Sequence, residues 1–306
     1  MLKKKIIFIV GPTAIGKSAV AISLAKKIKA EIISTDSMQV YRKMDIITSK
    51  VNHAQRRAIK HHLLGIIKPT LEYNVARYRR DALLICNKLF KQGKIPLFVG
   101  GTGLYYSVII DGLFAAVPED KGIRAELYKQ ARLKTSRYLH KKLAGVDPAI
   151  AKKIHPNDTK RIIRALEVYM KTGKPISSLQ KQRKGLGPEY RIKIFGLNCP
   201  RQALYKKIEM RVERMFSLGL IDEVKRLLKY KLSKTAACAI GIRELRGYFD
   251  GEYPLDDAKR LIQRNSRHYA KRQLTWFRKD KRIQWINIKD KETPQGVVQR
   301  IWKKLS

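Results

Sequence analysis

The segment of the sequence best suited to chemistry is a glycine-rich motif near the N-terminus. Residues 11–18 satisfy the pattern G-x-x-x-x-G-K-[ST] of a phosphate-binding P-loop. Its glycines let backbone amides turn toward phosphate oxygens, Lys17 supplies a positive charge, and Ser18 supplies a hydroxyl for Mg²⁺. The residues expected to hold a diphosphate or triphosphate are Gly11, Pro12, Thr13, Ala14, Ile15, Gly16, Lys17 and Ser18.

A carboxylate is expected in the same cleft. The apolar run 95–99 ends in Gly-Gly-Thr-Gly, without the Asp that many P-loop ATPases use to hold Mg²⁺, which disfavours a hydrolase. Asp36 instead follows a strand predicted at 31–34. Because the carboxyl ends of adjacent parallel strands face one crevice, Asp36 and Thr102 should lie near Lys17. Asp36 is therefore a candidate general base for a nucleophile attacking near the phosphates, or else a carboxylate that caps a loop or belongs to the shell of a metal ion.

The elements that position these residues follow a parallel α/β pattern. Apolar runs predict strands, and the segments between them predict helices. The predicted strands are 6–10, 31–34, 95–99, 190–197 and 282–288, and the predicted helices of this core are 18–29, 77–92, 201–231 and 255–279. This order predicts an α/β fold of the P-loop NTPase type, with a parallel sheet and long basic helices toward the C-terminus.

A second domain is predicted inside this core. From residue 114 the pattern becomes almost entirely helical, with helices expected at 122–132, 136–143 and 158–172, and a Gly-rich basic connector at 181–188. We therefore expect a helical insertion domain at 114–188 within an α/β core formed by 1–113 and 189–306.

The charge of the chain predicts a polyanionic partner. Lys and Arg number 67 against 25 Asp and Glu, a formal net charge of +42. The basic residues at helical spacing are Arg260, Arg264, Arg267 and Lys271 in one segment and Arg161 and Arg164 in another. Such stripes bind nucleic-acid phosphates, although a solvated face is the alternative. Tyr269, Trp276 and Phe277 lie among these residues and could stack on an unpaired base, but core packing is favoured for Trp276 and Phe277.

Other site classes have little support. Cys86, Cys199 and Cys238 are too far apart in sequence to indicate a disulfide framework or a zinc site, and the adjacent pair His61 and His62 indicates a structural role. No apolar run approaches the length of a membrane span, and the apolar run at the start is too short for a signal peptide. We expect a cytoplasmic monomer with no membrane partner.

Six motifs follow one another along the chain: GPTAIGKS (11–18), STDSMQVYRKMDI (34–46), HHL (61–63), PLFVGGTGLY (96–105), DP…IHPNDTKRIIRALEVY (147–169) and RHYAKRQLTWFR (267–278). In these motifs and their order the chain resembles the tRNA dimethylallyltransferases, bacterial type, along nearly its whole length. The resemblance implies transfer of a dimethylallyl group from dimethylallyl diphosphate to N6 of the adenine just 3′ of the anticodon, position 37 of tRNA, with release of diphosphate.

The resemblance also implies roles for particular residues. The P-loop would hold the prenyl diphosphate with Mg²⁺ at Ser18, Asp36 would take the proton from the adenine amine, and the further catalytic positions would be Thr102, Arg124 and Arg211. Together with the basic stripes, it predicts contacts between the tRNA anticodon loop and Asp36, Ser37, Met38, Gln39, Lys160, Arg161, Arg164, Gly241, Arg243, Arg264 and Arg267.

Four positions depart from the family's pattern. Ile47 and Val51 replace a glycine and a proline, Gly65 replaces an acidic residue, and Ile242 replaces a frequent aromatic. They affect loops expected near the prenyl pocket and one tRNA contact.

Three other functions are compatible with parts of the sequence. They are a prenyltransferase for free adenine nucleotides, a small-molecule kinase with ATP in the P-loop, and a non-catalytic RNA-binding protein. The intact P-loop and Asp36 disfavour the last. The insertion and the basic C-terminal helices favour tRNA over the first two.

Overall fold

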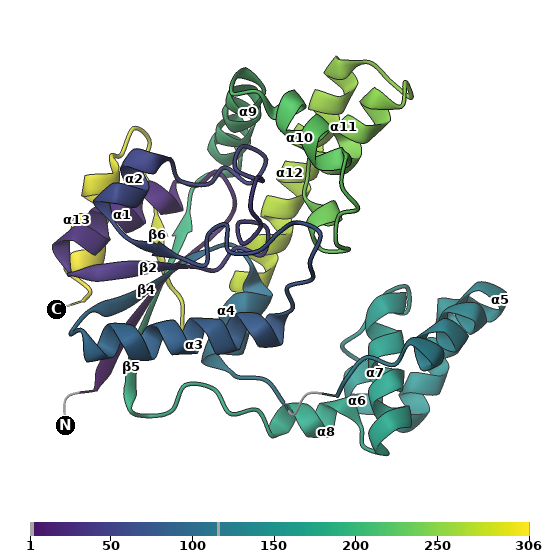
Figure 1. Cartoon of the computed structure of the whole chain (residues 1–306). Coiled ribbons are helices and arrows are strands. Elements are labelled where there is room, and N and C mark those ends of the chain that lie inside the picture. The colour runs from purple at the N-terminus through teal and green to yellow at the C-terminus, as the bar shows by residue number, and fades with distance from the viewer. Residues whose placement is uncertain (1–2, 115–116, 306) are drawn as a thin grey trace. The chain divides into compact units, whose positions relative to one another are not determined.

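The computed structural model describes residues 3–114 and 117–305. The chain divides into two compact units (Figure 1). The larger combines Met1–Ile109 with Pro188–Ser306, and the smaller is Ile110–Gly187. The predicted insertion, 114–188, covers nearly the same segment as the smaller unit.

The larger unit is built on one parallel sheet, as predicted. Its strands are β1 (Lys4–Val10), β2 (Ala30–Ser34), β3 (His61–His62), β4 (Ile95–Gly100), β5 (Tyr190–Asn198) and β6 (Gln284–Asn287). Their order is β3-β2-β4-β1-β5-β6, and all neighbouring pairs are parallel. The sequence missed β3, which has only two residues. There His62 Nε2 lies 2.6 Å from Glu31 Oε2, so this histidine ties β3 to β2.

In the residues described, the structure has helices in all four segments predicted for this unit, and four further α-helices, at 53–58, 103–110, 242–249 and 294–302, that were not predicted. The α-helices of this unit are α1 (Lys17–Lys27), α2 (His53–Ala58), α3 (Val75–Lys91), α4 (Gly103–Ile110), α9 (Arg201–Ser217), α10 (Leu220–Leu228), α11 (Ile242–Phe249), α12 (Leu255–Phe277) and α13 (Pro294–Trp302). The prediction of one helix over 201–231 is wrong. Gly219 has a φ of 90° and separates α9 from α10, because glycine enters this left-handed region without steric cost.

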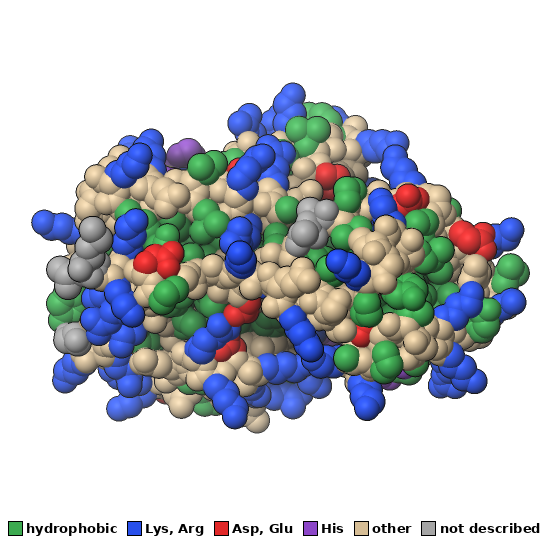
Figure 2. Space-filling model, turned by 90° about the horizontal axis from the view of Figure 1, so that it is seen from below, with side chains coloured by type: hydrophobic (Ala, Val, Ile, Leu, Met, Phe, Trp, Pro, Cys, Tyr) green, Lys and Arg blue, Asp and Glu red, His purple; other side chains and the backbone are tan. Residues whose placement is uncertain are grey.

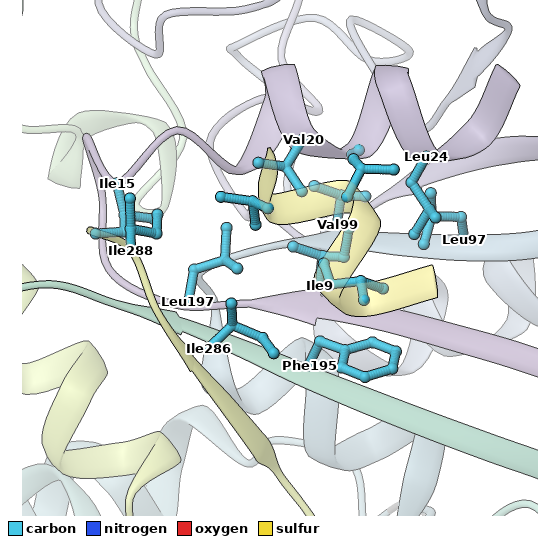
Figure 3. Close-up of a cluster of buried hydrophobic side chains, with 14 of the residues drawn as sticks. Ile9, Ile15, Val20, Leu24, Leu97, Val99, Phe195, Leu197, Ile286 and Ile288 are labelled. Atoms are coloured by element: carbon cyan, nitrogen blue, oxygen red, sulfur yellow. The ribbon is translucent and has the colours of Figure 1, made fainter. Parts of the chain in front are cut away.

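The sheet is covered on both faces (Figure 1). Ile7 and Ile9 of β1 belong to an apolar cluster with buried residues of α1 and α13. Figure 3 shows part of this cluster, with Ile9 labelled. Phe8 points the other way, where it stacks on Phe98 at 4.6 Å between ring centroids and meets the edge of Tyr106 at 5.5 Å. This two-sided burial explains why β1 is a continuous apolar run. It also fixes the strand ends from which the functional loops leave.

The smaller unit is helical. Its helices are α5 (Lys121–Val146), α6 (Pro148–Ala151), α7 (Thr159–Thr172) and α8 (Ile176–Lys181). Helix α5 is interrupted at Thr135, whose φ of 73° and ψ of 159° are non-helical, which agrees with the two separate helices predicted there. The unit has a core of its own, with Leu139 and Val168 fully buried. In the two described stretches, no helix is long and apolar enough to cross a membrane.

Candidate active site

The P-loop connects β1 to α1 at the carboxyl edge of the sheet. Ala14 and Gly16 have positive φ angles of 63° and 98°, so the backbone turns tightly around the loop. Helix α1 begins at Lys17, directly after this turn. Amides of such a turn and the N-terminus of a helix together attract an anion. The loop therefore has the backbone geometry that its motif predicts.

Two cations lie at this loop. Lys17 Nζ donates to the carbonyl oxygen of Pro12 at 2.7 Å, and Arg211, from α9, donates to the hydroxyl of Thr13. Burial lowers the pKa of Lys17 to about 7, with the charge of Asp36 opposing that effect and the charge of Arg211 adding to it. Burial also lowers the pKa of Arg211, again opposed by Asp36. An anion bound beside these two side chains would therefore stabilise their positively charged forms.

Asp36 follows β2 and belongs to the same cluster. Its Oδ1 accepts hydrogen bonds from the amides of Met38, at 2.9 Å, and Gln39, at 3.3 Å. Asp36 therefore caps the turn at 37–39, as one of the two predicted alternatives requires. Both of these bonds use Oδ1, and the Asp36 charge also acts on Lys17 and Arg211. The carboxylate thus lies near enough to the P-loop cations to interact with them electrostatically, which leaves the other alternative, a general base beside the phosphates, open.

Thr102 lies beside Asp36, as the strand order predicts, since β4 is the neighbour of both β2 and β1. Its hydroxyl accepts from the amide of Ser37 at 3.1 Å. Tyr269, from α12, completes this part of the site and lies next to Thr102 and Gln273. Burial and the nearby charge of Asp36 raise the pKa of Tyr269 to about 12. Tyr269 therefore stays protonated and can act as a hydrogen-bond donor at neutral pH.

The glycines after β4 allow helix α12 to pack on the backbone of this loop. A Cβ on Gly101 would lie 2.0 Å from Gln273 Nε2, and a Cβ on Gly103 would lie 2.3 Å from Trp276 Cδ1. Only glycine permits such close approach. Sequence reasoning missed Gln273 as a site residue. The prediction that Trp276 packs in the core is wrong, since 41% of this residue is exposed. The same prediction for Phe277 is confirmed, because this residue is fully buried.

Arg124, a predicted catalytic residue, lies in the smaller unit. Its guanidinium binds both carboxylate oxygens of Glu167 at 3.0 Å each and also pairs with Glu119 at 2.8 Å. Arg164 reaches the same Glu167 at 2.6 Å. Glu167 is fully buried, so these two arginines neutralise an interior carboxylate. The signal available in the sequence was a glutamate on an apolar helix face, three residues after an arginine.

The other predicted tRNA contacts fall into three groups. Ser37, Met38 and Gln39 form the turn that Asp36 caps. Lys160 and Arg161 are exposed on α7 in the smaller unit. The remaining positions are exposed Arg243 and Arg264, half-buried Arg267 paired with Glu209 at 3.0 Å, and Gly241, whose amide donates to Glu244 at 2.7 Å.

The departures at 47 and 242 both lie in buried positions. The buried Glu223 accepts from the amides of Asp45, Ile46 and Ile47 at 2.9–3.0 Å and so fixes this loop. A Cβ built on Gly241 would lie 3.1 Å from Ile47 Cδ1, so the side chain of Ile47 packs close to Gly241. The side chain at 47 thus occupies space next to the segment that carries the second departure, Ile242, which is itself buried.

The departure at 65 concerns a buried cation. A Cβ on Gly65 would lie 3.6 Å from Lys50 Nζ, so the family's acidic side chain at 65 would sit beside this ammonium. Here Asp45 pairs with Lys50 at 2.9 Å instead.

The residues present fit a Mg²⁺ ion that arrives with a diphosphate. Mg²⁺ in such sites binds one or two protein oxygens together with substrate phosphates and water. Ser18 provides one hydroxyl in the first turn of α1. Within residues 3–114 and 117–305, no group of three or more His, Cys, Asp or Glu side chains could hold a metal.

Basic side chains also cover much of the surface outside this cluster. Figure 2 shows Lys and Arg distributed over the whole of the face in view, with far fewer Asp and Glu among them. Such a surface attracts a polyanion over a wide area.

Comparison with known proteins establishes the family. The model of the IPP transferase family matches residues 39–280, and the model of an isopentenyl transferase family matches residues 4–61. The tRNA dimethylallyltransferase of Carboxydothermus hydrogenoformans is 47% identical over 302 residues, which cover 98% of this chain and 97% of that protein. The chain belongs to the IPP transferase family. The tRNA dimethylallyltransferase of Thermotoga maritima is similarly 45% identical over 98% of this chain and 97% of its own length.

Solved structures of IPP transferase relatives have the same fold. The tRNA isopentenylpyrophosphate transferase of Bacillus halodurans superposes with a TM-score of 0.72 at 37% identity, covering 99% of this chain and 97% of that one. A eukaryotic dimethylallyltransferase acting on tRNA superposes with a TM-score of 0.79 at 29% identity, covering 97% of this chain and 77% of that one. The fold predicted from the sequence, a P-loop-like α/β core, is therefore confirmed.

Proposed function

We propose that this protein transfers a dimethylallyl group from dimethylallyl diphosphate to N6 of adenine 37 in tRNA and releases diphosphate. The observation that carries the proposal is the convergence of Lys17, Asp36, Thr102 and Arg211 at one edge of the sheet. This cluster suits a diphosphate site beside a carboxylate base, and relatives that match along nearly the whole chain are tRNA dimethylallyltransferases.

The reaction would proceed by displacement at the first carbon of the prenyl group. The bond from the adenine N6 nitrogen to this carbon forms while the bond from the carbon to diphosphate oxygen breaks. Lys17 and Arg211 would stabilise the negative charge that grows on the departing diphosphate. Mg²⁺ at Ser18 would add positive charge at the same oxygens when it is bound. Asp36 would accept the proton that N6 loses.

The tRNA substrate is supported by charge and by chemistry. The net charge of +42 favours a large polyanion over a free nucleotide. The adenine amine is stacked inside an anticodon loop, so the base must be extruded before it can meet Asp36. We infer that the exposed basic residues Arg243 and Arg264 bind backbone phosphates, as do Lys160 and Arg161 in the smaller unit. We further propose that the enzyme acts as a monomer in the cytoplasm.

The test uses labelled dimethylallyl diphosphate with one of three acceptors: an anticodon stem-loop RNA with adenine at position 37, the same RNA with guanine there, or AMP. We expect label only in the first RNA, and Lys17→Ala should abolish most of it. Label on AMP alone would favour the free-nucleotide enzyme. ATP-dependent phosphorylation of a small molecule, without prenyl transfer, would favour the kinase.

A further inference from the structure

One buried amide side chain joins the two loops of the site. Gln273 lies on α12 and only 5% of it is exposed. Its Oε1 accepts from the amide of Thr13 in the P-loop at 2.8 Å, and its Nε2 donates to the carbonyl oxygen of Gly101 in the loop after β4 at 2.9 Å. The planar side-chain amide of Gln273 is therefore hydrogen-bonded to both loops, the one that follows β1 and the one that follows β4.

Each loop that Gln273 holds carries a group of the proposed machinery. Thr13 accepts from Arg211, on the diphosphate side. Gly101 precedes Thr102, which accepts from Ser37 in the turn that Asp36 caps. A displacement reaction needs the attacking nitrogen and the prenyl carbon aligned at about 3–3.5 Å, and a shift of about 1 Å can cost 10²-fold in rate. The relative position of these two loops is thus decisive for the chemical step.

We propose that Gln273 is a positioning residue that sets the P-loop against the Thr102 loop and so aligns the prenyl carbon with the adenine amine. It does not touch the reacting atoms in this scheme. The inference rests on the proposed function, because it concerns the alignment of the two substrates named there. It requires that Gln273 donate and accept at the same time. A side chain that fills the same space but cannot both donate and accept a hydrogen bond should therefore slow prenyl transfer.

Substitution by glutamate tests this requirement directly. A protonated carboxyl can donate to Gly101 and accept from Thr13 as the amide does, whereas an ionised carboxylate can only accept. Burial, the nearby Asp36 charge and the Gly101 carbonyl oxygen oppose ionisation, while Lys17 and Arg211 favour it. The Gln273→Glu variant should therefore recover activity as the pH falls and its carboxyl gains a proton.

The measurement is single-turnover prenyl transfer to the anticodon stem-loop RNA, with both substrates saturating, between about pH 6 and pH 9. Each variant's rate is divided by the wild-type rate at the same pH, which removes the pH dependence that the variant shares with the wild-type enzyme. At high pH we expect a loss of about 10- to 100-fold for Gln273→Glu, the scale of one unsatisfied buried polar group. This ratio should rise as the pH is lowered. Gln273→Met, which can neither donate nor accept through oxygen or nitrogen, should lose a similar factor at every pH.

Two controls separate the possible outcomes. Gln263→Glu makes the same chemical change on α12 at a partly exposed position, and its ratio should stay flat with pH. RNA affinity, measured by filter binding, should be unchanged in the Gln273 variants, whereas a general loss of structure would lower affinity and rate together. A Gln273→Met variant with the wild-type rate, or a Gln273→Glu ratio that falls as the pH is lowered, would overturn the proposal. An inactive wild-type enzyme would instead overturn the proposed function.

Discussion

Replacing Asp36 with asparagine or with alanine separates its two roles. In Asp36→Asn the side-chain oxygen can still accept from the amides of Met38 and Gln39, but the group can no longer take up a proton. We expect the chemical step to slow by about 10²–10⁴, equivalent to about 3–5 kcal/mol of barrier. Asp36→Ala should slow to a similar extent. It also leaves two amides without their acceptor, which should cost about 1–2 kcal/mol of unfolding free energy.

The assay must exclude an indirect effect through the neighbouring cation. The charge of Asp36 raises the pKa of Lys17, so either variant lowers that pKa and weakens diphosphate binding at neutral pH. Single-turnover rates are therefore compared at saturating prenyl diphosphate, alongside urea unfolding and RNA binding. A wild-type rate in Asp36→Asn would exclude Asp36 as the general base. Parallel losses of rate and RNA affinity in Asp36→Asn would assign Asp36 to the scaffold alone.

Three further predictions address the P-loop, the basic stripe and the helical unit. Lys17→Ala should lose about 10²–10³ in rate. Because burial lowers the pKa of Lys17 to about 7, prenyl diphosphate binding should weaken as the pH rises above 7, and Lys17→Arg, measured by calorimetry, should remove that dependence. Arg264→Ala should flatten the log-log salt dependence of RNA binding by about 0.9, and Arg267→Ala by less, since Glu209 already pairs with Arg267; equal slopes in both variants would contradict this. Thr135→Gly should raise the unfolding free energy by about 1 kcal/mol in urea titrations, because it relieves a backbone conformation that favours glycine at an exposed position, and a fall would contradict the strain.

The parts of the site that the sequence could predict are those encoded by adjacent residues and by strand order. The P-loop is a contiguous motif, so its turn and the start of α1 follow from local geometry. Asp36 and Thr102 could be placed beside Lys17, because each follows a strand and parallel strands end at the same edge. A turn-capping role for Asp36 was foreseeable too, since aspartate often accepts from amides two or three residues on.

The parts that the sequence could not predict come from helices far along the chain. Arg211 and Gln273 meet the P-loop from 198 and 260 residues away, and helical periodicity alone does not say which loop a helix face will meet. The sequence showed the glycines after β4 but gave no reason for them, whereas the structure shows that Gly101 is required by the close packing of Gln273. The prediction that Arg124 is a catalytic residue depended on the family resemblance alone. The strong pairing of Arg124 with the buried Glu167 emerges only when the two helices are packed together.

Helix α12 explains why the basic stripe and the catalytic loops can be perturbed separately. Successive residues of an α-helix turn by about 100°, so residues two apart point in nearly opposite directions. Arg267 and Tyr269 are such a pair, and so are Lys271 and Gln273. Tyr269 and Gln273 face the loops of the site, so the stripe of Arg267 and Lys271 faces away from them. The aromatic residues interleaved with the stripe in sequence therefore do not share its surface. If the stripe binds phosphates, its variants should change salt dependence and leave the chemical step intact, whereas Gln273 variants should do the reverse.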